Sequence, residues 1–202
     1  MHNDFSRRQI ATGALAALAA ALCGAATSPA RAMDAAAQRI ETYYKTLLPA
    51  VTGASGLGVA QRAQRITPAI LSAFDIAGMT RIAVGPAWSR FSEAERSATI
   101  EAFGKFIVAD YANQLGDYSG EAYKVDPNVE PRGGDEIVKT WLGSTAINYL
   151  MRGTRIIDIY ANGTVSELAT RRAEFTSILA SSGGAQGLAA ELRQRTQQLL
   201  GG

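Results

Sequence analysis

The side chains that come closest to catalytic chemistry are carboxylates beside apolar runs: Asp75, Asp110, Asp117, Glu121 and Asp158. Two carboxylates that converge can act as a general acid and a general base, but sequence spacing alone does not bring them together. Asp75 is better explained as a helix cap, and Asp158 as a polar strand residue or the partner of a nearby arginine. The carboxylates therefore indicate structural roles more strongly than catalysis.

Nucleophilic and metal-binding side chains are scarce in this sequence. The one histidine, His2, and the one cysteine, Cys23, both lie within the first 32 residues. Beyond them, the hydroxyls of Ser144, Thr154 and Ser166 have no histidine to activate them, and neither a common zinc site nor a disulfide can form. We therefore expect no enzymatic activity, no metal and no cofactor in residues 33–202.

A glycine-rich run, GASGLG at residues 53–58, loosely has the spacing of a dinucleotide-binding fingerprint. That fingerprint requires a strand before it and a helix after it, and the run here follows a helical pattern. It is predicted to be a linker between two helices.

The first 32 residues have the plan of a cleavable export signal. Arg7-Arg8 precede an alanine-rich apolar run from about residue 10 to 26, and Ala30-Arg31-Ala32 offers small residues for cleavage after Ala32. The sequence SRRQI partly matches a twin-arginine signal, which leaves the twin-arginine and the general export routes both open. An uncleaved membrane anchor is the alternative. We expect export to the periplasm, and one mature domain over residues 33–202.

Composition and charge limit the possible partners. The chain has 202 residues, 47% of them hydrophobic and 19% charged, which is typical of one globular domain besides the signal. Of its 20 basic and 18 acidic side chains, Arg7, Arg8, Arg31 and Asp4 belong to the signal, so the remainder is electrically balanced. Nucleic-acid-binding domains normally carry a basic excess. We expect no nucleic-acid partner.

Apolar stripes at helical spacing predict six helices. The longest begins at a capping box formed by Ser92 and Glu95, and its stripe continues to Leu115. Asp75 is the expected cap of a short helix that ends at Gly85-Pro86. The predicted helices cover about residues 34–51, 59–74, 76–84, 93–115, 166–181 and 185–200.

Between the longest helix and the last two helices, the pattern changes to that of strands. The predicted strands are Glu121–Val125, Glu136–Leu142, Ala146–Met151 and Arg155–Ala161. The turns between them are too short for parallel crossovers, so neighbouring strands are expected to be antiparallel. The last strand ends at a predicted turn, Asn162-Gly163, and Ser166 then caps a helix. The fold class is α+β, an antiparallel sheet of about four strands covered by several helices.

Aromatic residues are spread over both the helices and the strands. Each fits an ordinary core, but helices that cover a curved sheet can also enclose a ligand cavity. The residues concerned are Phe74, Trp88, Phe103, Phe106, Tyr111, Trp141, Tyr149 and Tyr160.

The chain resembles a known family in several separate tracts. The tract from Phe74 to Val125, the strand IIDIYANGTVS and the following RRAEFTSIL are similar to the periplasmic phospholipid-binding family of the MlaC type, and most of all to its hopanoid-biosynthesis-associated HpnM branch. The similarity extends from about Ile40 to Leu199. Its most specific pieces are Phe74-Asp75, Gly85 with Trp88, Ser92 with Glu95-Arg96, Tyr111, the spacing of Asp158, Gly163 and Ser166, and Arg172 with Phe175.

This resemblance implies a monomeric periplasmic carrier without enzymatic activity. Such a protein holds a phospholipid or a hopanoid-type lipid in an apolar cavity and exchanges it with membrane-embedded transport partners of the inner and outer membranes. It would serve as an auxiliary component of an ABC transporter that maintains outer-membrane lipid asymmetry. A non-lipid binding or structural module of the envelope is the first alternative, and an unrecognised hydrolase is the second.

The lipid is expected to lie between the longest helix and the sheet, because the inward stripes of those elements form the largest contiguous apolar set. The predicted lipid-binding residues are Phe74, Met79, Trp88, Phe103, Ile107, Tyr111, Trp141, Tyr149, Met151, Ile157 and Ile159. A solid core would produce the same stripes. A basic cluster on the last two helices predicts a surface for a transport partner, formed by Arg171, Arg172, Arg193 and Arg195.

Overall fold

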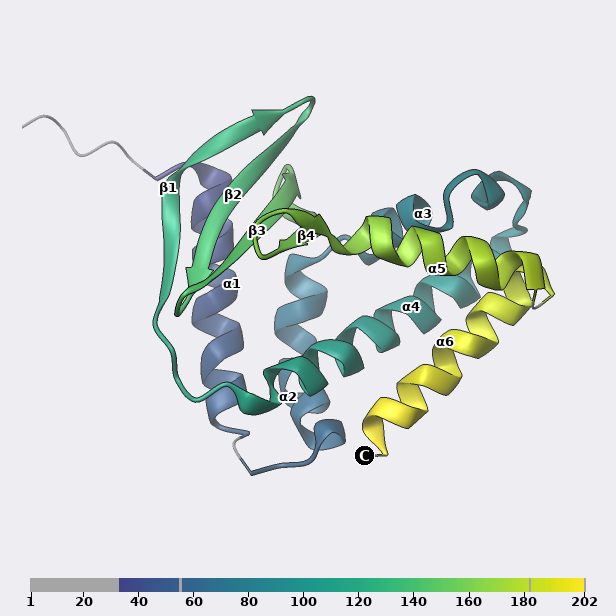
Figure 1. Ribbon diagram of the computed structural model, residues 1–202, viewed down its shortest axis with the longest axis horizontal. Helices are drawn as coiled ribbons and strands as arrows, with labels where there is room; N and C mark the ends of the chain where they lie inside the picture. Colours follow the sequence, from purple (N-terminus) through teal and green to yellow (C-terminus); the bar gives the residue numbers. More distant parts are fainter. Residues whose placement is uncertain (1–32, 55, 182, 202) are drawn as a thin grey trace, which may run out of the picture. The chain divides into compact units, whose positions relative to one another are not determined.

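The computed structural model describes residues 33–54, 56–181 and 183–201, and the predicted export signal lies outside these residues. Among these residues four α-helices come first, five strands follow, and two α-helices come last (Figure 1). The α-helices are α1 (Ala35–Thr52), α2 (Val59–Ala73), α3 (Ile76–Val84), α4 (Glu93–Gln114), α5 (Glu167–Ser181) and α6 (Gly184–Leu200), with short 3-10 helices η1 (Gly85–Arg90) and η2 (Leu115–Asp117).

The predicted helix starts are confirmed by their capping contacts. Ser92 and Glu95 form the capping box of α4: the Glu95 amide donates to the Ser92 hydroxyl at 3.3 Å, and the Ser92 amide donates to the Glu95 carboxylate at 2.8 Å. The Gly78 amide donates to the Asp75 carboxylate at 2.9 Å, which satisfies a free donor at the start of α3. Local hydrogen bonding therefore fixes where the two helices that flank η1 begin.

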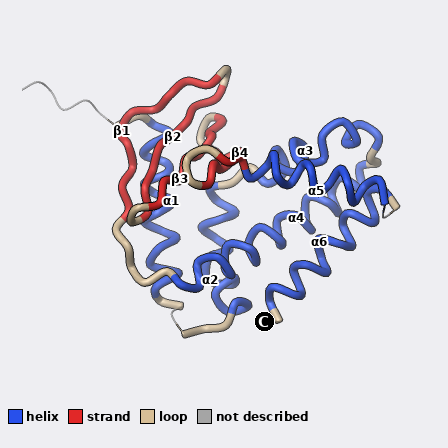
Figure 2. Tube along the Cα trace, in the orientation of Figure 1, coloured by secondary structure: helices blue, strands red, loops and turns tan. Residues whose placement is uncertain are grey.

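The strands form one antiparallel sheet in the order β1-β2-β3-β4-β5 (Figure 2). Their bounds are β1 Tyr123–Arg132, β2 Asp135–Leu142, β3 Thr145–Arg152, β4 Arg155–Ala161 and β5 Val165–Ser166. The predicted turn after β4 is confirmed, because Asn162 (φ 50°) and Gly163 (φ 76°) both have positive φ. The sheet thus has the predicted antiparallel arrangement with one additional short strand.

The first strand is longer than the predicted Glu121–Val125, because it continues through two prolines to Arg132. Its register against β2 shifts between Val125 and Val129. There Asp34, at the start of α1, replaces β2 as the partner: its amide donates to the Pro127 carbonyl at 3.0 Å, and its carboxylate accepts from the Val129 amide at 3.0 Å. Proline has no amide hydrogen to donate to a neighbouring strand, and Asp34 pairs with the backbone of β1 where β2 does not.

Asp158 joins the sheet to α5. Its carboxylate is buried and accepts hydrogen bonds from the Ser166 hydroxyl at 2.6 Å and the Leu168 amide at 3.1 Å, while Ser166 accepts from the Ala169 amide at 2.9 Å. The predicted cap at Ser166 is confirmed. Asp158 is a polar strand residue, and its partners are a hydroxyl and backbone amides.

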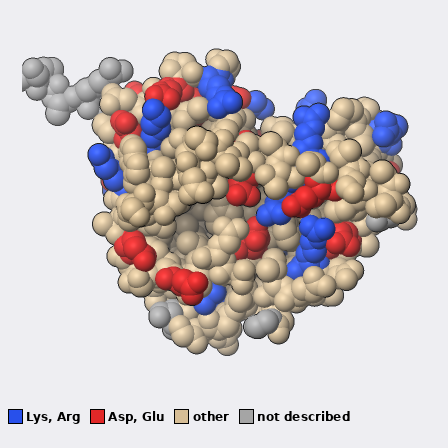
Figure 3. All heavy atoms as spheres, viewed as in Figure 1, with Lys and Arg blue, Asp and Glu red and all other residues tan. Residues whose placement is uncertain are grey.

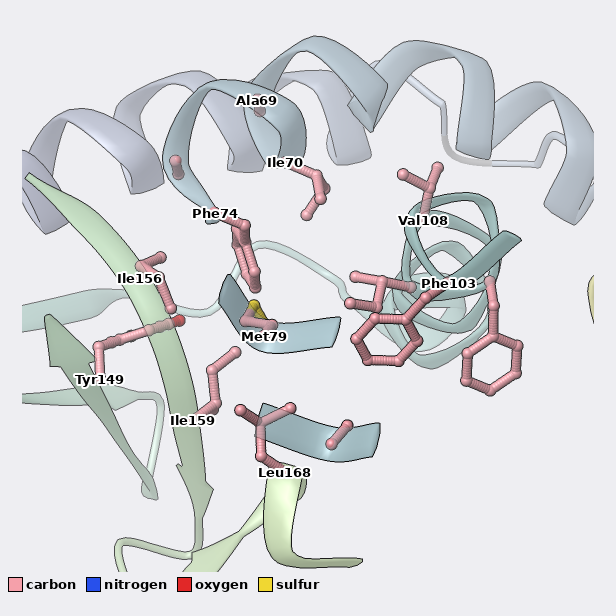
Figure 4. Packing of buried hydrophobic residues seen from close by; sticks show 14 of the residues in the cluster. Ala69, Ile70, Phe74, Met79, Phe103, Val108, Tyr149, Ile156, Ile159 and Leu168 are labelled. Atoms are coloured by element: carbon pink, nitrogen blue, oxygen red, sulfur yellow. The ribbon is translucent and has the colours of Figure 1, made fainter. Parts of the chain in front are cut away.

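The buried core lies between the sheet and the helices. In Figure 4, Phe74, Met79, Ile159 and Leu168 gather between strands β3 and β4 on one side and α4 on the other. Helix α1 packs against β1 and β2, and α4 packs against α2 and α6 (Figure 1). The predicted α+β class is confirmed, and several helices cover one sheet.

Candidate functional site

A cavity of about 300 Å³ lies between α1, α4 and strands β2 to β4. Figure 3 shows this face hollowed, with acidic side chains at the edge of the hollow. Most of the wall is apolar, and polar side chains gather at one end. The apolar wall consists of Tyr43, Tyr44, Leu47, Leu48, Phe74, Met79, Phe103, Ile107, Tyr111, Leu115, Leu142, Ile147, Tyr149, Ile159, Ala161 and Leu168.

Seven of the eleven residues predicted to bind lipid line this cavity. They are Phe74, Met79, Phe103, Ile107, Tyr111, Tyr149 and Ile159. Alternation along the strands places Tyr149 and Ile159 opposite each other in register and on the cavity side. The helical stripe of α4 supplies Phe103, Ile107 and Tyr111 from the other side. The sequence thus indicated two of the walls.

The structure places the other four residues elsewhere. Trp88 lies in η1 beside a separate cleft, and Trp141 lies under the Lys124 ammonium, which is 5.2 Å from its ring centre. Met151 and Ile157 are buried at the register shift between β3 and β4, where Ile157 has no cross-strand partner. A β-bulge of this kind interrupts the alternation from which the inward positions were predicted.

Helix α1 forms a wall that the predicted lipid site did not include. Its stripe of Tyr43, Tyr44, Leu47 and Leu48 was visible as one helical face, but a core-packing helix has the same stripe. Only the three-dimensional arrangement shows that this face lines the cavity as well as packing against the sheet.

Three tyrosine hydroxyls on the α1 side of the cavity differ in their hydrogen bonding. Tyr149 donates to the Tyr44 hydroxyl at 3.0 Å, and Tyr44 lies 3.0 Å from the Thr140 hydroxyl. The buried Tyr43 hydroxyl has no hydrogen-bond partner among the described residues. Burial raises the pKa of Tyr43 and of Tyr149 well above the usual value, so both remain neutral donors. Tyr43 therefore lines the cavity and carries a buried hydroxyl without a partner among the described residues.

The polar end of the cavity carries more negative than positive charge. Asp110 and Glu167 line it together with Arg171, whose guanidinium lies 2.8 Å from the Asp110 carboxylate and 4.0 Å from that of Glu167. Burial raises the pKa of Glu167; Arg171 opposes that shift, and Asp110 adds to it. The uncharged residues at this end are Gln114, Thr145 and Asn162.

This arrangement suits binding an amphiphile better than it suits catalysis. Of the five carboxylates considered in the sequence, only Asp110 lines the cavity, where Arg171 pairs with it, while Asp75 and Asp158 cap or tether helices. The described residues contain no group of three or more histidine, cysteine, aspartate or glutamate side chains that could hold a metal ion. An apolar wall with one charged end can take up a hydrocarbon tail and leave a polar head at the mouth.

The four arginines predicted to bind a partner are divided among different environments. Arg171 and Arg195 share the Glu174 carboxylate, at 3.2 and 3.3 Å, and Arg195 also pairs with Glu191 at 2.8 Å. Arg172 lines a second cleft, and Arg193 is exposed on α6. Ion pairs therefore occupy two of the four, and the set is not one free basic surface.

Within the described residues, no helix is both long and apolar enough to cross a bilayer.

Comparisons with known proteins agree with this geometry. A solved structure, described as the phospholipid-binding protein from Ralstonia solanacearum in complex with a phospholipid, shares the fold with a TM-score of 0.71 at 21% sequence identity. The alignment covers 81% of this chain and 98% of that chain. No curated protein matches the sequence. The model of the MlaC protein family matches residues 49–194, which is well over half of the chain, so the protein belongs to the MlaC family.

Proposed function

We propose that the protein is a periplasmic lipid carrier that holds a phospholipid or a hopanoid-type lipid and exchanges it with membrane-embedded transport partners. The observation that carries this proposal is the cavity between α1, α4 and the sheet, with its continuous apolar wall and charged end. Family membership and a fold shared with a phospholipid-binding protein support it. In this role the protein acts without enzymatic activity.

Hydrophobic transfer explains how such a carrier works without chemistry. Each methylene removed from water gains about 0.8 kcal/mol, so an acyl chain gains on the order of 10 kcal/mol. A bilayer offers a similar gain, and a carrier therefore only has to match it for exchange to run in either direction. The partners then determine the direction.

The test is to purify the protein natively from the periplasm and analyse an organic extract by mass spectrometry. We expect one lipid class in near-stoichiometric amount, and the class found decides between a phospholipid and a hopanoid. An extract without lipid, from protein that takes up none from vesicles, would favour a non-lipid envelope module instead. Intact mass of the same sample tests the signal, because cleavage after Ala32 gives a protein that begins at Met33.

We also propose that the carrier docks on its transport partners through part of the predicted basic surface. Arg193 is the best residue for testing this, because it is exposed and forms no ion pair with the described residues. Reversing its charge should weaken capture of the partners from solubilised membranes and leave the lipid content unchanged. Unchanged capture would exclude Arg193 from the docking surface.

A further inference from the structure

A second concave site lies apart from the cavity and shares no lining residue with it. This arginine cleft has a volume of about 1080 Å³ and opens between α3, η1, the first turn of α4, the end of β3 and α5. It is lined by Asp75, Gly78, Arg81, Ile82, Gly85, Pro86, Trp88, Ser89, Arg96, Arg152 and Arg172. Four arginines from four separate segments of the chain therefore face one space.

The positive charge of the arginine cleft is only partly neutralised. Asp75 is its one acidic lining residue, and that carboxylate accepts the capping hydrogen bond from Gly78. Arg152 forms a bidentate pair with Asp135, at 2.8 and 2.7 Å. The side chains of Arg81 and Arg172 form neither an ion pair nor a hydrogen bond with the described residues, and both residues are exposed. The two carboxylates, Asp75 and Asp135, are fewer than the four arginines, so the cleft keeps an excess of positive charge.

Two of the guanidinium groups lie close to the backbone of η1. Arg96 donates to the Trp88 carbonyl at 3.3 Å and lies over the Trp88 ring at 5.6 Å, while its buried Nε has no hydrogen-bond partner among the described residues. Arg172 lies against Gly85, where an added Cβ would come within 3.0 Å of Nε and Nη2. Gly85 also has a φ of +65°, which favours glycine. The backbone at Gly85 thus leaves room for the Arg172 guanidinium.

We propose that the arginine cleft binds a phosphate-type anion. Guanidinium groups match the oxygens of phosphate in a bidentate manner, and a phosphate has enough oxygens to be shared by several arginines that approach from different sides. A single guanidinium is enough to pair with the carboxylate of an acidic side chain. The cleft has four arginines and no lysine, and this set therefore favours phosphate over an acidic side chain. The anion is either free phosphate or the phosphate of a lipid headgroup presented by a membrane.

The first experiment is a calorimetric titration of the exported protein, purified from the periplasm, with inorganic phosphate at low ionic strength. The double variant Arg81→Gln/Arg172→Gln removes two exposed charges from the cleft and breaks no ion pair of the described residues. The control Lys124→Gln/Arg132→Gln removes two exposed positive charges of β1, outside the cleft. We expect the cleft variant to bind phosphate at least about tenfold more weakly and the control to bind as the parent does.

The second experiment uses flotation with vesicles of phosphatidylcholine, with or without phosphatidylglycerol. If the protein binds phosphate and its flotation does not depend on the cleft, the ligand is free phosphate. If the protein floats with the anionic vesicles and only the cleft variant loses this flotation, the ligand is the lipid headgroup. Either result supports the site. Equal behaviour of the cleft and control variants in both experiments, or no binding in either, would overturn it. Lipid content of the cavity, measured in the same samples, reports separately on the carrier function.

Discussion

Two neighbouring arginines on α5 lie in opposite electrostatic environments. Arg171 reaches the cavity mouth, where Asp110, Glu167 and Glu174 surround it, and its guanidinium also lies 4.9 Å from the Phe106 ring centre. Arg172 faces away from them into a cleft that it shares with three other arginines. One helix therefore separates an acidic site suited to holding an amphiphile from a basic site suited to an anion.

The difference shows how little a pair of identical residues reveals about function. Successive residues on an α-helix point about 100° apart, so Arg171 and Arg172 face different parts of the protein. Arg171 neutralises carboxylates and joins α5 to α4 and, through Glu174, to α6. Arg172 retains a positive charge that an external ligand can use. The neighbours of each arginine, and not its type, determine its role.

The largest expected effect is on lipid binding, and it distinguishes the cavity from the cleft. Ile107→Trp places an indole in the space proposed for the ligand, so we expect bound lipid to be lost, stability to be nearly unchanged and phosphate binding in the cleft to remain. Ile157→Trp is the matched control, because Ile157 is buried outside the cavity lining; overpacking there should cost about 1 to 3 kcal/mol and spare lipid binding. Lipid analysis and thermal unfolding measure both. Equal destabilisation by both substitutions would mean that Ile107 belongs to a solid core.

The next largest effect is a difference in stability between variants of Arg171 and Arg172. Arg171→Met leaves Asp110 and Glu167 without their cation, and we expect the free energy of unfolding to fall by about 1 to 2 kcal/mol, because the Arg171 side chain is only 18% exposed. Arg172→Met should change it by less than about 0.5 kcal/mol, as for other exposed side chains. Urea unfolding measures both variants. A larger loss for Arg172→Met would show that Arg172 has a structural role.

A smaller contrast concerns two tyrosines within the cavity wall. Tyr44→Phe removes the hydroxyl that lies between Tyr149 and Thr140, and should cost about 1 kcal/mol. Tyr43→Phe removes a hydroxyl without a partner among the described residues, so the lipid-free protein should be as stable as the parent or slightly more stable. Unfolding of delipidated samples measures this. Weaker lipid retention by Tyr43→Phe would identify its hydroxyl as a ligand contact.

The smallest expected effect is on the pH dependence at the cavity mouth. Burial raises the pKa of Glu167, so the folded protein holds this proton more tightly than the unfolded chain does. The free energy of unfolding therefore falls as the pH rises from the ordinary glutamate pKa through the raised value. Solvent screening of this 39% exposed side chain limits the effect to about a few tenths of a kcal/mol.

The matching variant is Glu167→Gln, measured by thermal unfolding between pH 4 and pH 8. We expect it to lose this part of the pH dependence and to be slightly more stable than the parent at neutral pH. A slope that persists unchanged in the variant would assign the titration to another carboxylate.

Much of the fold could be predicted because local signals coincide with it. The Ser92-Glu95 box, the Asp75 cap and the Asn162-Gly163 turn each depend on contacts within a few residues, and all three are present. The length of β1 could not be predicted, because its continuation past Pro127 depends on Asp34, a residue far away in the sequence.

The candidate site was predictable only where regular periodicity holds. Stripes on α4 and alternation on β3 and β4 indicated Ile107, Tyr149 and Ile159, whereas the bulge beside Ile157 interrupted the pattern. The arginine cleft has no sequence signature of its own, because its four cations are brought together by the fold. Five residues that carry the family resemblance, Asp75, Gly85, Trp88, Arg96 and Arg172, nevertheless line that cleft.

The position of the two tryptophans has a spectroscopic consequence. Trp88 lies in the cleft against Arg96, and Trp141 lies beside Lys124, whereas Tyr43, Tyr44, Tyr111 and Tyr149 line the cavity. An anion that draws the Arg96 guanidinium from the indole should alter Trp88 fluorescence, with Trp141 as a constant background. Lipid uptake should leave that emission unchanged and appear instead in the near-ultraviolet circular dichroism of the tyrosines. The chain thus contains a separate intrinsic chromophore for each site, and occupancy of the two can be followed at once in unlabelled protein.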